Sequence, residues 1–172
     1  ILLAQGQSYD QALICFFQAN SFEKDSISCS GLVNAHLSLN KIKDATLAAK
    51  DALTLMPKSP ASFLLIGQCL SRSSSANGLQ ESIKAYSKAL KLCPGYSKAA
   101  MCMSESLISL GKLNEASACL RNALDHQQQQ NHTGSHSTHL RIQYAKVLAS
   151  LGNYPEAIEQ LHISVAQSPA TS

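Results

Sequence analysis

Four histidines form the densest cluster of potential metal ligands in this 172-residue chain. His126, His132, His136 and His139 fall within fourteen residues, and imidazole nitrogens are common ligands of zinc and other transition metals. The surrounding stretch is rich in Gln, Ser, Thr and Gly, with Asp125 as the nearby carboxylate and no cysteine. Because nothing there fixes a ligand geometry, we expect a polar loop and no metal site, with adventitious metal binding as the alternative.

The six cysteines do not form the pattern of a nucleophile or a metal site, because no C-x-x-C pair occurs. Cys15 and Cys119 take the same place in two copies of the repeat described below, which indicates packing rather than reactivity. Scattered, reduced thiols of this kind are typical of a cytosolic or nuclear protein.

Catalysis has almost no support in the sequence. The motifs G-x-x-x-x-G-K-[ST], G-x-G-x-x-G, H-E-x-x-H and G-x-S-x-G are all absent. Two acid pairs, Asp44 with Asp51 and Glu156 with Glu159, are expected to be charges on helix surfaces. We therefore predict that the chain is not an enzyme and has no catalytic residue and no cofactor.

Two charged features could serve as contact sites. Lys84, Lys88 and Lys91 form a stripe along an expected helix, which is usually a solvated face but could contact a partner. Arg72 lies three residues before Ser75, a spacing that basophilic kinases use and that is also frequent by chance.

One spacing pattern occurs five times and organises the chain. In each copy an apolar residue follows a small residue by four positions, and a second small residue follows three positions later. Successive copies begin 33, 37, 34 and 41 residues apart, close to the period of about 34 of a known helical repeat. The copies are Ala12/Phe16/Ala19/Lys24, Ala45/Ala49/Ala52/Pro57, Ser82/Tyr86/Ala89/Pro94, Ala116/Leu120/Ala123/Gln128 and Ala157/Leu161/Ser164/Pro169.

Each copy predicts a helix, since residues spaced four and three apart share one helix face. A second helix is expected ahead of each full copy, and small residues such as Gly67 would allow the two helices to approach closely. Polar stretches at 71–78 and 127–138 are expected to absorb the extra residues as loops. The expected first helices cover 26–39, 61–70, 97–110 and 138–151.

Such helix pairs are typical of the tetratricopeptide repeat. The predicted fold is all-α: a tetratricopeptide-repeat solenoid, in which antiparallel helix pairs build a right-handed superhelix, rather than a globular bundle. We expect a single array over 1–172, and, because both ends interrupt the pattern, a fragment of a longer chain. The expected units are a half repeat at 1–25 and repeats near 26–59, 60–96, 97–137 and 138–172.

The composition argues against nucleic acid and membranes as partners. The chain is 45% hydrophobic and 15% charged, lacks Trp and has a net charge of +3, whereas nucleic-acid surfaces need clustered Lys and Arg or stacking rings. The longest apolar run, at 12–17, is six residues, far short of the roughly 20 that cross a bilayer.

In this repeat class the first helices of the pairs line a concave groove, so a ligand-facing set can be chosen from the sequence. Chaperone-adaptor members hold a terminal carboxylate with a clamp of two Lys, two Asn and one Arg, of which Asn34 and Lys98 remain here. The other places hold Ser30, Leu65 and Cys102, which disfavours a co-chaperone; a helix or another repeat array is the expected occupant. The candidate protein-binding residues are Asn34, Leu64, Gln68, Lys98, Met101, Glu105, Gln143 and Lys146.

At the level of particular residues the chain resembles the family of anaphase-promoting complex (cyclosome) subunit 7. The resemblance rests on NKIKDA at 40–45, KAL at 88–90 with PGYSKA at 94–99, and LRNAL at 120–124. It implies a non-catalytic scaffold of a cell-cycle ubiquitin ligase in the nucleus and cytoplasm, with catalysis in separate cullin and RING subunits. The implied partners are other tetratricopeptide-repeat subunits, and a second copy bound through earlier repeats outside this segment.

A different class of function stays open. The repeats could recruit substrates for a catalytic domain outside 1–172, as in glycosyltransferases or phosphatases that carry such arrays. A catalytic motif elsewhere in the full-length chain would favour that alternative.

Overall fold

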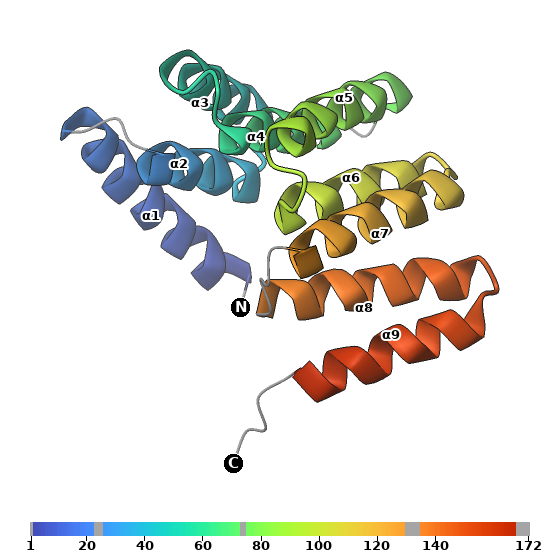
Figure 1. The fold of residues 1–172 in the computed structure, drawn as a ribbon. Coiled ribbons are helices and arrows are strands. Elements are labelled where there is room, and N and C mark those ends of the chain that lie inside the picture. Colours follow the sequence, from blue (N-terminus) through green and yellow to red (C-terminus); the bar gives the residue numbers. More distant parts are fainter. Residues whose placement is uncertain (1, 23–25, 73–74, 130–134, 168–172) are drawn as a thin grey trace. The chain divides into compact units, whose positions relative to one another are not determined.

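The computed structural model describes residues 2–22, 26–72, 75–129 and 135–167. Within these ranges the chain forms nine helices and no strand, which confirms the all-α fold class (Figure 1). The helices are α1 (Leu2–Phe22), α2 (Ser26–Ser38), α3 (Ile42–Leu55), α4 (Pro60–Ser71), α5 (Ala76–Leu92), α6 (Ser97–Ser109), α7 (Leu113–Gln129), α8 (Ser135–Ser150) and α9 (Tyr154–Gln167). None of them is long and apolar enough to span a bilayer.

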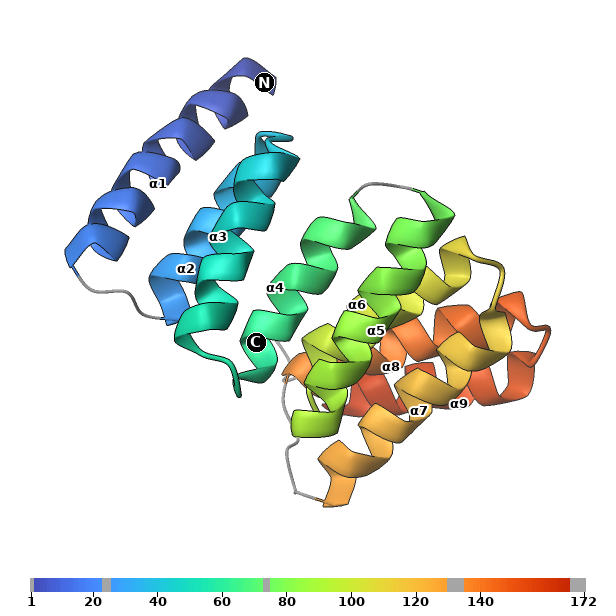
Figure 2. The same ribbon diagram turned by 90° about the horizontal axis from the view of Figure 1, so that it is seen from above.

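The helices group into two compact units, Ile1–Leu92 and Cys93–Ser172. In the first unit each helix packs on the next, and α2 also contacts α4. The second unit repeats this arrangement, because α6 to α9 pack in chain order and α6 also contacts α8. Figure 2 shows α4 and α5 lying side by side as one such pair. In both units, therefore, the first helices of successive pairs are neighbours.

Three of the helix pairs are joined by the same tight turn. A residue with positive φ follows the first helix: Asn40 (57°), Gly111 (74°) or Gly152 (80°). The next backbone N–H then donates to a carbonyl five residues back, as in Lys112 to Leu107 at 2.9 Å. This closure satisfies carbonyls at the helix end, and glycine or asparagine adopts the left-handed conformation at the lowest cost.

The repeat pattern forms the core, as its spacing predicts. The motif residues Ala45, Ala49 and Ala52 of α3 are buried, as are those of α5 and α7. In α9, Ala157 and Ser164 are buried, but the intervening Leu161 is 43% exposed. The three- and four-residue spacing therefore places the motifs of α3, α5 and α7 on the inner faces of their helices, whereas Ala12 and Phe16 of α1 are half-buried.

The two expected loops are shorter than the sequence suggests. The chain between α4 and α5 is helical up to Ser71 and again from Ala76, because the Ser75 hydroxyl caps α5 by accepting the Gly78 backbone N–H at 3.0 Å. The helix α7 continues through Gln129, and α8 begins at Ser135. The expectation of a loop over 71–78 and 127–138 is wrong at these helical ends, and residues 73–74 and 130–134 lie outside the described residues.

Candidate protein-binding site

In the second unit, two of the predicted binding residues meet at one cavity. Lys98 and Met101 of α6 line a hollow of about 360 Å³ together with Tyr96, Ser97 and His139. His139 comes from α8, and its side chain and that of Lys98 are exposed, whereas Met101 is half-buried. The cavity exists because α6 and α8 are packed neighbours.

The other predicted residues of this unit lie outside that cavity. Glu105 is exposed near the end of α6, Gln143 is half-buried on α8 and Lys146 is exposed one turn later. They extend the same two helices but do not line the hollow. A ligand that entered at Lys98 would have to continue along the helices to meet them.

A buried glutamine holds part of the lining of this cavity in place. The Gln127 Nε2 group of α7 donates to the Gly95 carbonyl at 3.0 Å and to the Ser97 hydroxyl. These bonds hold the turn that carries Tyr96 and Ser97 against α7. The expectation that Gln127 lies in a polar loop is wrong. Gln127 follows buried Ala123 by four residues, so extending the helical spacing by one turn would have predicted that it is buried on the same face.

The lining of the cavity combines a few polar groups with a larger apolar surface. Burial, followed by the nearby Cys93 and Cys102, raises the pKa of the Tyr96 hydroxyl. The phenol therefore stays protonated at neutral pH and can donate a hydrogen bond. With the ammonium of Lys98 and the thioether of Met101, the site offers donors and a deformable apolar surface together.

In the first unit the predicted residues separate. Asn34 of α2 is exposed and Gln68 of α4 is half-buried. Leu64 of α4 is 3% exposed, so it is packed and offers almost no surface to a ligand. Of the three predicted residues in this unit, Asn34 and Gln68 are therefore accessible to a ligand and Leu64 is not.

Solved structures with a similar fold and one protein with a similar sequence are known. No protein-family model matches it. A thermophilic TPR protein of Thermus thermophilus superposes with a TM-score of 0.75 at 21% identity, covering 99% of this chain and 88% of that one. MamA superposes with a TM-score of 0.65 at 13% identity, covering 95% and 91%.

The fold is that of the tetratricopeptide repeat. A third such structure, YrrB, described as a TPR protein with an unusual peptide-binding site, has a TM-score of 0.58 at 18% identity and covers 99% of this chain and 83% of its own. In sequence, 123 residues are 32% identical to anaphase-promoting complex subunit 7 of Arabidopsis thaliana. The match includes 72% of this chain and 22% of that relative, so the chain spans about a fifth of its length.

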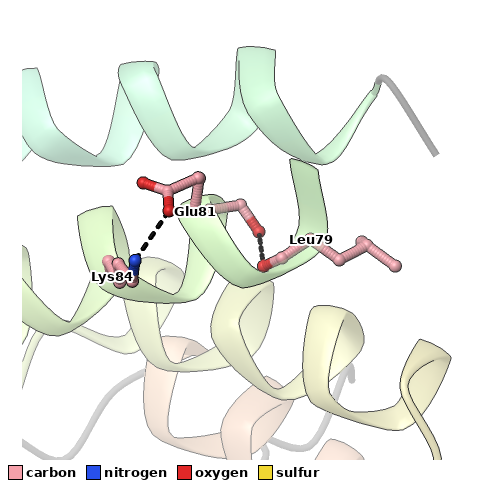
Figure 3. Close-up of polar contacts among 4 residues, drawn as sticks. Leu79, Glu81 and Lys84 are labelled. Atoms are coloured by element: carbon pink, nitrogen blue, oxygen red, sulfur yellow. Dashed lines mark hydrogen bonds and ion pairs between the residues drawn. The ribbon is translucent and has the colours of Figure 1, made fainter. Parts of the chain in front are cut away.

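The lysine stripe is not a uniform cationic surface on this tetratricopeptide-repeat helix. Lys84 forms an ion pair with Glu81 at 2.7 Å on the same helix (Figure 3). Lys88 lies over the ring of Phe63 of α4, with Nζ 5.8 Å from the centroid. All three lysines are exposed, but these contacts reduce what Lys84 and Lys88 offer to a ligand.

The histidines do not meet in the described residues. His126 is exposed on α7 and His139 is exposed on α8. His132 lies outside the described residues, as does the side chain of His136. In the part of the chain that the structure describes, no three His, Cys, Asp or Glu side chains are grouped closely enough for a metal ion.

The cysteines differ in access. Cys29 and Cys69 are buried and Cys119 is half-buried, and burial raises the pKa of the Cys69 and Cys119 thiols to about 11. Cys15 of α1 is exposed. The expectation that Cys15, like Cys119, is a packing residue is therefore wrong.

One of the acids predicted to be a surface charge joins two helices instead. Glu156 of α9 accepts the Tyr144 hydroxyl of α8 at 2.8 Å and the Asn153 amide at 2.6 Å. Asp44, Asp51 and Glu159 are exposed, as expected. The Tyr144 to Glu156 bond thus fixes the last helix pair of this tetratricopeptide-repeat unit.

Proposed function

We propose that this chain is a non-catalytic, protein-binding scaffold, and that it works as a structural subunit of the anaphase-promoting complex, a ubiquitin ligase acting in the cell cycle. The observation that carries the binding function is the cavity shared by Lys98 and Met101 of α6 and His139 of α8. The 32% identity to anaphase-promoting complex subunit 7 over 72% of the chain supports the choice of complex.

The cavity suits a protein segment better than a small metabolite. It is open to solvent at Lys98 and His139 and continues along exposed residues of the same helices. In the proposed complex an acidic or polar side chain of the partner binds Lys98 and the Tyr96 hydroxyl, and an apolar one packs on Met101. Glu105 and Lys146 then select the charge pattern of the same segment further along the helices.

The partners follow from the same proposal. They are other tetratricopeptide-repeat subunits of the ligase, with pairing of two copies assigned to repeats outside this segment. Location in the nucleus and cytoplasm belongs to this proposal as well.

The test is affinity purification of the intact protein from dividing cells, with subunits identified by mass spectrometry. We expect cullin-like, RING and other repeat subunits to co-purify. Their absence would overturn the assignment to the ligase.

A matched pair of variants tests the cavity within the same experiment. Lys98→Glu combined with Met101→Asp should reduce recovery of a neighbouring repeat subunit, while Lys58→Glu, an exposed charge change in the turn before α4, should not. Equal recovery from both would reject the cavity as the binding site and leave the scaffold function standing.

A further inference from the structure

A second hollow lies in the first unit, away from the predicted binding residues. It has a volume of about 650 Å³ and is formed by α1, α2 and α3. Figure 1 shows α2 between the other two helices, and the described parts of α1 and α3 each pack on α2. The hollow is therefore a groove with α2 as its floor and α1 and α3 as its walls. We call it the α1–α3 groove.

The walls of the α1–α3 groove expose large apolar side chains. Ile14 and Phe17 of α1 are 58% and 68% exposed, and Leu47 of α3 is 62% exposed, yet all three line the same groove. Leaving such side chains in water costs about 25 cal/mol for each Å². Apolar patches with polar rims on a soluble protein mark interaction surfaces.

The rim of the groove is acidic. Asp44 and Asp51 of α3 line it, and among the residues that the structure describes no Lys or Arg does. Neither carboxylate forms an ion pair within the described residues. Their neighbours Lys43 and Lys50 lie on an adjacent strip of α3, outside the lining. The two aspartates are seven residues apart, about two helical turns, so they lie on one side of α3.

We propose that the α1–α3 groove binds an amphipathic helix of a partner protein that carries Lys or Arg two turns apart. The apolar face of that helix covers Ile14, Phe17 and Leu47, and its two cations lie beside Asp44 and Asp51. The spacing of the carboxylates along α3 matches a helical ligand lying parallel to α3, and the charge fixes its register.

A second copy of this chain is a poorer occupant. The exposed apolar stripe of α9, formed by Tyr154, Ile158 and Val165, belongs to a helix with two glutamates and no Lys or Arg. It would bring Glu156 and Glu159 toward an acidic rim. The lysines of α5 are also unsuitable, because the apolar face of that helix, including Tyr86, is buried in its own unit.

The probe is a synthetic, fluorescently labelled helical peptide of about 18 residues with a leucine face and two lysines placed two turns apart. The matched peptide carries glutamates in place of the lysines. Binding is measured by fluorescence anisotropy with the 172-residue chain. We expect the lysine peptide to bind at least about tenfold more tightly than the glutamate peptide, with an affinity that falls as salt rises.

Variants test the location. Leu47→Glu should weaken the lysine peptide by about tenfold or more, while Leu55→Glu, on the same helix and outside the groove lining, should not. Asp44→Lys combined with Asp51→Lys should reverse the preference toward the glutamate peptide. Circular dichroism melts verify that each variant is folded.

Two results would overturn the inference. Equal binding of the two peptides would remove the role of the aspartates. Equal effects of Leu47→Glu and Leu55→Glu would place the peptide elsewhere, and because both positions are exposed, a folding defect is not expected to mask this result.

Discussion

Gly67 of α4 lies directly against the ring of Tyr86 of α5. A Cβ atom at Gly67 would be 2.6 Å from Cδ1 and 2.8 Å from Cζ of the tyrosine, whose side chain is 1% exposed. The ring thus occupies the volume that any other residue at 67 would need. The small residue expected there from the sequence is present because two helices approach at that point.

Gly67→Leu should therefore destabilise the protein. Leucine gains about 0.8 kcal/mol of helix propensity over glycine, but the overlap with the buried ring of Tyr86 costs more, for a net loss of about 1–3 kcal/mol. Urea unfolding followed by circular dichroism measures the change. Ala118→Leu, an exposed site on α7, is the control, and an unchanged or raised unfolding midpoint for Gly67→Leu would contradict the contact.

Gln127→Ala should cost about 1–3 kcal/mol, because it leaves the buried Ser97 hydroxyl and the Gly95 carbonyl without this donor. Gln128→Ala, at the exposed neighbouring position, should change the unfolding free energy by less than about 0.5 kcal/mol. Equal losses in the two variants would show that the side-chain amide of Gln127 holds nothing in place.

Thiol modification near neutral pH should distinguish Cys15 from Cys69 and Cys119. A thiol with a pKa of about 11 is about one part in ten thousand thiolate near pH 7, and the thiolate is the reactive form. Iodoacetamide labelling read by peptide mass spectrometry should modify Cys15 first. In denaturant all three should react, and rapid native labelling of Cys119 would refute its burial.

Tyr144 predicts a loss of stability in alkali. Burial, followed by the hydrogen bond to and charge of Glu156, raises the pKa of its hydroxyl to about 12, whereas an unfolded tyrosine has a pKa of about 10. Between these values the unfolded chain releases the proton more readily, so the stability contributed by Tyr144 is complete below a pH of about 10 and is lost as pH rises toward 12.

Tyr144→Phe isolates this effect. At a pH of about 8 the variant should be less stable than the wild type by about 1–3 kcal/mol, because Glu156 loses a hydrogen bond. At a pH of about 11 the difference should shrink, and urea unfolding at both pH values measures it. A difference that stays constant with pH would assign the alkaline loss to other groups.

The helices could be predicted because their signal is local. Residues such as Ala45, Tyr86 and Leu120 recur at helical spacing, and the structure buries each of them. Glycine at 111 and 152 marks turns that need a positive φ. Asn40 adopts the same conformation without being a glycine. Gln127 extends the buried face of α7 with a polar side chain, so the polar composition of 127–138 wrongly predicted a loop at its start.

The candidate sites were harder to predict because exposure depends on which helix faces acquire a neighbour. Lys98 and Met101 meet at a cavity as their helix position suggests, but Leu64, chosen by the same rule, is packed. Leu47 is an apolar residue of the kind expected in a core, yet it is exposed. The described parts of α1 and α3 both pack on α2, and neither covers Leu47. Nothing in the local sequence of α3 encodes the distance to α1.

The pattern of helix contacts has a consequence for cooperativity. Each helix is held mainly by the one before and the one after it in its unit, so the coupling energy passes along the stack in one dimension. Phe16 packed on Gly31 is one such junction, between α1 and α2. Amide hydrogen exchange should therefore follow a gradient, with protection lost helix by helix around a weakened junction rather than throughout a unit at once.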